Sequence, residues 1–179
     1  INLLKEVIED GYLGIGKKVS EFEFKIKNYL DTDLNVVCVN SGTAALHLAL
    51  QSIDIGFGDE VIIPSITYLA TFQAVSATGA KPISCEVNPS NGFLDLQDAE
   101  KRITNKTKAI IPVHFAGNSM DIEKVYKLAN SYNLRVIEDA AHSFGSIRNS
   151  KKIGQVGDII CFSFDGIKNI TCGEGGAIL

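Results

Sequence analysis

Short apolar runs alternate with helix-like segments along most of the chain, and this alternation constrains the fold more than any other feature. Runs such as "NVVCV", "EVIIP", "KAIIPV" and "RVIED" are short and rich in β-branched residues, which is typical of buried strands. Helical patterns lie between them, at about residues 43–52, 67–78, 96–103 and 121–132. The sequence therefore predicts an α/β fold with a mostly parallel central sheet and helices on both faces.

Length and composition indicate one compact domain with a short addition. The chain has 179 residues, of which 45% are hydrophobic, enough to bury a sizeable core. Residues 1–30 read as an N-terminal segment of two amphipathic helices, and residues 31–179 read as the large α/β domain. The last residues, "GGAIL", read as a strand with nothing after it, so we expect the chain to be a piece of a longer protein.

Charge and cysteine content argue against several functional classes. The formal net charge is −4, with acidic and basic residues mixed, so no basic stripe indicates nucleic acid or a membrane surface. The charged N-terminal sequence is not a signal peptide. The four cysteines lack C-x-x-C spacing and are interpreted as reduced thiols of a cytoplasmic protein. No histidine has metal-ligand spacing to another, so we expect no metal site.

One motif match is rejected. The segment "GYLGIGKK", from Gly11 to Lys18, fits the opening G-x-x-x-x-G-K of a nucleotide-binding phosphate loop. However, Lys18 stands where that loop needs Ser or Thr to hold magnesium, and a helical stretch precedes the segment instead of a strand. We interpret it as a glycine-rich turn between two helices.

The turn in "VNSGTAALHLAL" is a candidate phosphate site. It joins a strand to a helix, whose free N–H groups and positive dipole end attract anions, and Gly42 permits close approach. An ordinary helix cap by Ser41 or Thr43 would leave the same pattern. Because ligands of open α/β sheets collect at the carboxyl ends of the strands, we expect this turn to share one edge with Tyr68, His114, Asp139 and the 163–168 loop.

Asp139 and Lys168 extend this candidate site. Asp139, in "RVIEDAAHSFG", ends a strand, where its carboxylate can hold a protonated ring nitrogen, although this pattern taken alone favours a helix cap or a structural ion pair. His142 and His114 taken alone favour satisfied polar residues at a core edge. Lys168 closely follows an apolar strand and precedes the glycines of "GEGG", a setting suited to a Schiff base. Pyridoxal 5′-phosphate has the matching phosphate, ring nitrogen and aldehyde.

At this point the sequence resembles the DegT family of pyridoxal-phosphate-dependent sugar-nucleotide aminotransferases. The matching stretches run in family order and include "NSGTAALHLAL", "TKAIIPVHFAG", "VIEDAAHSFG" and "GDIICFSFDGIKNITCGEGGAI". The resemblance implies the large cofactor-binding domain of an aspartate aminotransferase-like, fold type I enzyme, with its small C-terminal domain absent from this chain. It also implies a cytoplasmic homodimer with shared active sites.

The resemblance assigns roles to single residues. Lys168 matches the lysine that bonds to the cofactor and shuttles protons, and Asp139 matches the partner of the pyridine nitrogen. His142 falls near the phenolic oxygen of the cofactor, and Tyr68 falls where an aromatic ring stacks on the pyridine. The positions that match phosphate donors, together with the glycine that permits their approach, are Gly42, Thr43, Ala44 and Ser163. Asp165 departs from the family, in which many relatives have His.

The resemblance implies transfer of an amino group, usually from glutamate, to a keto-sugar nucleotide in amino-sugar or cell-surface polysaccharide biosynthesis. The "TCGEGG" run favours a 4-keto-6-deoxy sugar, whereas relatives acting at C-3 more often show "SFYPGKN". A sugar dehydratase of the same family is an alternative, but those enzymes replace the Schiff-base lysine with His. A non-catalytic binding or regulatory relative is a second alternative, and it would need no Lys168.

Overall fold

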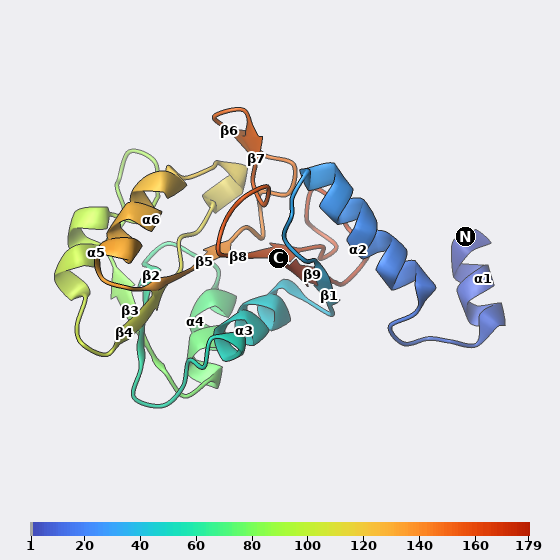
Figure 1. The fold of residues 1–179 in the computed structure, drawn as a ribbon, viewed down its shortest axis with the longest axis horizontal. Helices are drawn as coiled ribbons and strands as arrows, with labels where there is room; N and C mark the ends of the chain where they lie inside the picture. The colour runs from blue at the N-terminus through green and yellow to red at the C-terminus, as the bar shows by residue number, and fades with distance from the viewer. Residues whose placement is uncertain (1) are drawn as a thin grey trace.

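The computed structural model describes residues 2–179, which form a central sheet covered by helices (Figure 1). Its strands are β1 (Val37–Val39), β2 (Glu60–Pro64), β3 (Lys81–Cys85), β4 (Thr107–Ile110), β5 (Arg135–Asp139), β8 (Ile159–Ser163) and β9 (Gly176–Ile178). The helices are α1 (Asn2–Asp10), α2 (Lys17–Leu30), α3 (Gly42–Ser52), α4 (Leu69–Ala77), α5 (Leu96–Arg102) and α6 (Ile122–Ser131), with a 3-10 turn η1 (Phe115–Gly117). Among these residues no helix is long and apolar enough to cross a membrane.

The sheet has the strand order β1-β9-β8-β5-β4-β2-β3. The five strands from β8 to β3 are parallel, as the alternating sequence pattern predicts. At the other edge β9 is antiparallel to both β8 and β1. Because two reversals cancel, β1 runs in the same direction as β8, so the residues that follow β1 and β8 leave the sheet at the same edge.

Alternation along the strands divides the core into two faces. Val61, Ala109 and Ile137 point to the face covered by α3 and α4. Their neighbours Ile62 and Ile110 point to the opposite face, which α5 and α6 cover. On that second face Ile160, Phe162 and Phe164 of the β8 region pack against Ile26 and Leu30 of α2. Helices on both faces of a mostly parallel sheet confirm the predicted fold class.

Helix ends follow local sequence chemistry. Ser41 caps α3, since its hydroxyl accepts the N–H of Ala44 at 3.1 Å. Asp95 caps α5 by accepting the N–H groups of Gln97 and Asp98. After α4, Gly79 takes a positive φ of 87°, which a residue with a side chain rarely adopts.

The N-terminal segment contains α1 and α2, with the rejected phosphate-loop match in the turn between them. In Figure 1 α1 lies at the far end of the molecule from α5 and α6. Lys18, which breaks the motif, lies 3.6 Å from the carboxylates of Glu6 and Glu21. A short antiparallel hairpin of β6 (Ile147–Arg148) and β7 (Lys151–Lys152) was not predicted, because two-residue strands leave no periodic pattern.

Candidate active site

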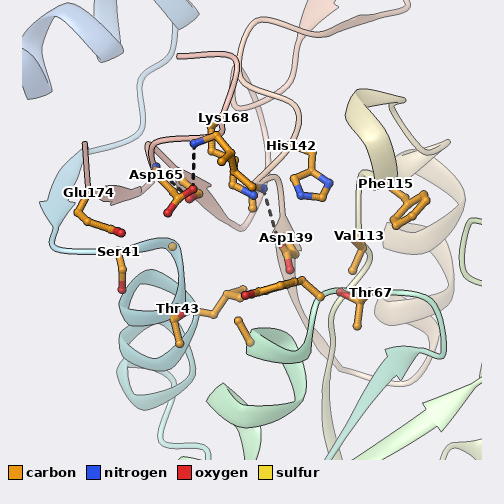
Figure 2. Close-up of a pocket in the computed structure, with 17 residues that line it drawn as sticks. Ser41, Thr43, Thr67, Val113, Phe115, Asp139, His142, Asp165, Lys168 and Glu174 are labelled. Carbon is orange, nitrogen blue, oxygen red and sulfur yellow. Dashed lines mark hydrogen bonds between the residues drawn. The ribbon is translucent and has the colours of Figure 1, made fainter. Parts of the chain in front are cut away.

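A pocket of about 260 Å³ opens at the carboxyl-end edge of the sheet. Figure 2 shows side chains from both halves of the sheet converging on it. They come from the loops after β1, β2, β4, β5 and β8 and from the approach to β9, which are separated by more than a hundred residues in sequence. The residues lining it are Ser41, Gly42, Thr43, Leu46, Thr67, Tyr68, Ala70, Val113, Phe115, Asp139, Ala141, His142, Ser163, Asp165, Ile167, Lys168 and Glu174.

The N-terminus of α3 forms one end of the pocket. The N–H groups of Gly42 and Thr43 precede the first intrahelical hydrogen bond, and both residues line the pocket. A Cβ on Gly42 would lie 2.8 Å from the Cβ of Ser163, so only glycine lets the helix approach the end of β8 this closely. The Ser163 hydroxyl accepts a long 3.4 Å bond from the N–H of Asp165, which leaves its proton for an acceptor in the pocket.

Ala44 departs from the prediction that made it a phosphate donor. Its N–H is bonded to the hydroxyl of Ser41, and Ala44 is not among the described residues that line the pocket. The helix cap and the predicted phosphate site, treated as alternatives from sequence, therefore need not compete, because the cap uses only one N–H of the turn. Ser41 satisfies Ala44, while Gly42 and Thr43 keep N–H groups at the positive end of the helix.

Asp139 lies at the base of the pocket, at the end of β5, and is only 4% exposed. Its Oδ2 accepts the hydroxyl of Thr71 at 2.8 Å, and its Oδ1 accepts the N–H of Ala141 at 3.2 Å. Within residues 2–179 no cationic group lies within 4.0 Å of this carboxylate. The structural ion pair considered from sequence is thus absent there, and the charge is held by neutral donors only.

Lys168 is half-buried and belongs to a tightly held loop. The N–H of Lys168 donates to the carbonyl of Asp165 at 3.0 Å, and the Asp165 carboxylate accepts the N–H of Ile167 at 3.1 Å (Figure 2). Downstream, Gly175 accepts from the N–H of Phe164 at 2.8 Å. These bonds fix the turn that presents the lysine toward the pocket.

The glycines after Lys168 allow close packing of the backbone. A Cβ on Gly176 would lie 2.5 Å from the carbonyl oxygen of Ser41, and one on Gly175 would lie 2.5 Å from the sulfur of Cys172. The glycines therefore let β9 and the lysine loop pack directly on the turn that begins α3. The "GEGG" run joins the lysine end of the pocket to its α3 end.

His142 and Tyr68 flank the pocket. Burial and the positive charge of Lys168 lower the pKa of His142, with Asp139 opposing, so His142 is neutral near pH 7. Tyr68 is the residue before α4; it lines the pocket and is 73% exposed. Phe115 and Val113, which sequence reasoning did not select, complete the wall, with the Phe115 ring 6.4 Å from that of His142.

His114 follows β4 as predicted but turns away from the pocket. It is completely buried, with Nε2 2.8 Å from a Glu138 carboxylate oxygen and Nδ1 accepting the N–H of Met120. That second bond fixes the tautomer, so a neutral His114 donates from Nε2. The hydroxyl of Tyr126 donates to the other oxygen of Glu138 at 2.8 Å, and burial beside this carboxylate raises the pKa of Tyr126. The network of His114, Glu138 and Tyr126 therefore belongs to the core, and none of the three lines the pocket.

The whole chain, residues 1–179, matches the DegT/DnrJ/EryC1/StrS aminotransferase family. The chain belongs to this family, which confirms the resemblance found in the sequence.

Individual relatives agree with this assignment. GDP-perosamine synthases of Escherichia coli O157:H7 and Caulobacter vibrioides are each 44% identical over 164 residues, which are 92% of this chain and 45% and 44% of theirs. The structure of S. venezuelae DesV in complex with a ketimine intermediate has a TM-score of 0.94 and 41% identity over 98% of this chain and 47% of that one. The chain spans about half the length of the relatives it matches.

The cofactor prediction is confirmed at the level of the family. A putative sugar aminotransferase from Streptococcus pneumoniae, solved in a PLP-form, has a TM-score of 0.88 and 33% identity over 98% of this chain and 49% of that one. The donor set of the pocket fits pyridoxal phosphate. Neutral N–H and hydroxyl donors at the positive end of α3 suit a phosphate, the buried carboxylate of Asp139 suits a protonated ring nitrogen, and the amine of Lys168 suits an aldehyde.

Proposed function

We propose that this chain is the cofactor-binding part of a pyridoxal-phosphate-dependent aminotransferase that acts on a keto-sugar nucleotide. The observation that carries the proposal is the convergence of the α3 N-terminus, Asp139 and Lys168 on one pocket. Each is a generic feature alone, but together they match one cofactor. Because this chain spans about half of its relatives, the activity, the substrates and the partner subunit all belong to the proposal.

In this proposal Gly42, Thr43 and Ser163 hold the phosphate through two backbone N–H groups and a hydroxyl. Asp139 holds the proton on the ring nitrogen, and the exposed ring of Tyr68 is placed to stack on the cofactor. Bound pyridoxal phosphate supplies an electron sink for the pair left when a C–H bond breaks. Lys168 Nζ would carry the proton, accepting it from the substrate carbon that bears the amino group and donating it to the adjoining carbon of the cofactor.

His142 has a supporting role in this proposal. A neutral imidazole beside the cofactor can hydrogen-bond to its phenolic oxygen without adding positive charge. The lowered pKa of His142, caused first by burial and then by Lys168, supports that protonation state.

For the substrate, we propose glutamate as the donor and a 4-keto-6-deoxy sugar on a nucleoside diphosphate as the acceptor. The glycine run after Lys168 favours this choice, and the name of the GDP-perosamine synthases supports a GDP-linked sugar. Lys168 is the sole cationic side chain among the described lining residues, so the diphosphate requires cations from outside them. We therefore propose a homodimer in which a partner subunit supplies them, and a cytoplasmic location.

Covalent labelling tests the cofactor site. Borohydride reduction of the protein loaded with pyridoxal phosphate should fix the cofactor to the peptide that contains Lys168, and Lys168→Ala should abolish this labelling. Lys152→Ala is the matched control, since Lys152 lies outside the pocket and donates to the carbonyl of Tyr29. Label on Lys151 or Lys152 would refute the assignment.

A pair of substrates tests the acceptor. With glutamate as donor, the 4-keto sugar nucleotide should be aminated and the matching 3-keto compound should not. Amination of the 3-keto compound alone would refute the proposed position on the sugar while leaving the cofactor site intact. Amination of neither, by a protein labelled at Lys168, would refute the substrate class.

A further inference from the structure

Two threonines below the pocket are not used in the function proposed so far. Thr71 lies in the first turn of α4 and is completely buried, and its hydroxyl lies 2.8 Å from Oδ2 of Asp139. The hydroxyl of Thr67, which lines the pocket, lies 2.7 Å from that of Thr71. Figure 2 shows Thr67 and Asp139 facing the same space from different elements. A chain of three polar groups therefore leads from the buried carboxylate to the pocket wall.

The direction of these hydrogen bonds follows from valence. The N–H of Ala141 can only donate to Asp139, and an ionised carboxylate can only accept. Thr71 must therefore donate its one proton to Asp139, and its oxygen must accept the proton of Thr67. Thr67 thereby becomes the donor of the pair. Because each bond polarises the next, the first hydroxyl strengthens the second as a donor.

We propose that the Thr67–Thr71 pair is a positioning unit that keeps Asp139 ionised and aimed at the pocket. The inference rests on the proposed function only in the role given to Asp139. A neutral donor stabilises the carboxylate without cancelling its charge, whereas an arginine or lysine in that place would neutralise it. The unit thus preserves the negative charge that a protonated ring nitrogen needs, at a carboxylate that is only 4% exposed.

A purely structural role for Thr71 is the competing explanation, since the bond also ties α4 to the end of β5. That role predicts lower stability on substitution and an unchanged kcat in the variant that still folds and binds the cofactor. The positioning role predicts a change in ionisation, because removing a hydrogen bond to the charged form of a carboxylate raises its pKa. The titration of Asp139 therefore tests whether the bond stabilises the ionised carboxylate, and kcat separates the two roles.

The test is a ¹³C NMR titration of the protein labelled at aspartate carboxyl carbons, without added cofactor. Asp139→Asn assigns the resonance. Thr71→Val, which replaces the hydroxyl by a methyl group, should move the titration of Asp139 to higher pH, because a donor to the charged form is lost. Thr71→Ser should restore the native value. Thr67→Val should raise it by less, because Thr71 still donates.

Thr78→Val is the matched control. Thr78 follows the same helix, and its hydroxyl donates to the carbonyl of Val75 at 2.8 Å, so its loss should lower stability and leave the Asp139 titration unchanged. If Thr71→Val does not fold, Thr67→Val decides, since Thr67 precedes α4 and is not fully buried. An unchanged pKa of Asp139 in the folded variants would overturn the proposal.

Activity then separates this inference from the proposed function. In the cofactor-loaded protein Thr71→Val should lower kcat for transamination about tenfold with little change in KM, since the charge of Asp139 matters most while the C–H bond breaks. If the wild-type protein transaminates no keto sugar, but the Thr71 and Thr67 variants change the titration of Asp139 as described, the proposed function is refuted and this inference stands.

Discussion

Replacing Gly42 by Ala should separate phosphate binding from folding. The added Cβ would lie 2.8 Å from the Cβ of Ser163 and 3.2 Å from its hydroxyl oxygen. Carbon atoms in favourable contact are about 3.5–4.0 Å apart, so the start of α3 and the end of β8 must separate by about 1 Å. Such overpacking costs about 1–3 kcal/mol, and the better helix propensity of Ala offsets up to about 1 kcal/mol of it.

The same displacement should affect the ligand more than the fold. A separation of about 1 Å moves the Ser163 hydroxyl and the N–H groups of α3 out of joint reach of one phosphate. Loss of one hydrogen bond to a charged group is worth about 1.5–3 kcal/mol, which is about a 10-fold to 100-fold weaker affinity. Spectroscopic titration should show this loss for pyridoxal phosphate and almost none for pyridoxal, which lacks the phosphate.

Gly56→Ala is the control for the glycine change itself. A Cβ at Gly56 meets only the carbonyl oxygen of Thr78, at an ordinary 3.9 Å, and the residue has no positive φ. This variant should bind both compounds normally. If Gly42→Ala weakened pyridoxal and pyridoxal phosphate equally, the phosphate would not bind at the start of α3. Unchanged affinity for both would refute the packing argument as well.

Three further variants test the remaining groups. Asp139→Asn should lower kcat about 100-fold or more while changing cofactor affinity much less, because charge develops during the reaction; turnover near the wild-type rate would refute the role. His142 has a lowered pKa, so the unfolded chain binds its proton more readily and the free energy of unfolding should fall as pH drops below about 6.5. Urea unfolding should show this decline flattened in His142→Gln, and an identical decline in both proteins would exclude His142 as its source. Glu138→Gln should destabilise the fold by about 1–3 kcal/mol in urea unfolding, since its amide cannot accept from both His114 and Tyr126; an unchanged midpoint would contradict that bonding.

The parallel core of the fold was predictable because it depends on local pattern. Buried runs such as Val61–Ile63 and Val136–Ile137 are β-branched, and a segment with a helical pattern precedes each of them. The antiparallel placement of β9 between β8 and β1 was not predictable. It depends on pairing between residues far apart in sequence, as in Val39 opposite Gly176, and a three-residue strand carries no signal of direction.

Within the site, sequence predicted those residues whose chemistry depends on backbone position. Gly42 and Lys168 follow strands and Asp139 ends one, and the topology brings the three residues to one pocket. Sequence reasoning failed where the direction of a side chain decides whether the residue lines the pocket. His114 also follows a strand, but it points into the core toward Glu138. Thr67 and Thr71 carried one usable signal, their four-residue spacing at a helix start, but nothing local indicated Asp139 as their partner.

The distribution of charge links these observations. The described lining residues include three carboxylates, Asp139, Asp165 and Glu174, and one amine, Lys168. A pocket with this balance can hold a phosphate only through neutral donors, which the start of α3 and Ser163 supply. In the proposed function those donors hold the phosphate, so Lys168 is not needed as its counter-ion and is available to bond with the aldehyde carbon. At Asp139 the neutral donors Thr71 and Ala141 likewise leave the negative charge uncancelled, and in the proposed function that charge faces the ring nitrogen at the other end of the ligand. Neutral donors at both ends thus leave the ionised groups to the reaction itself.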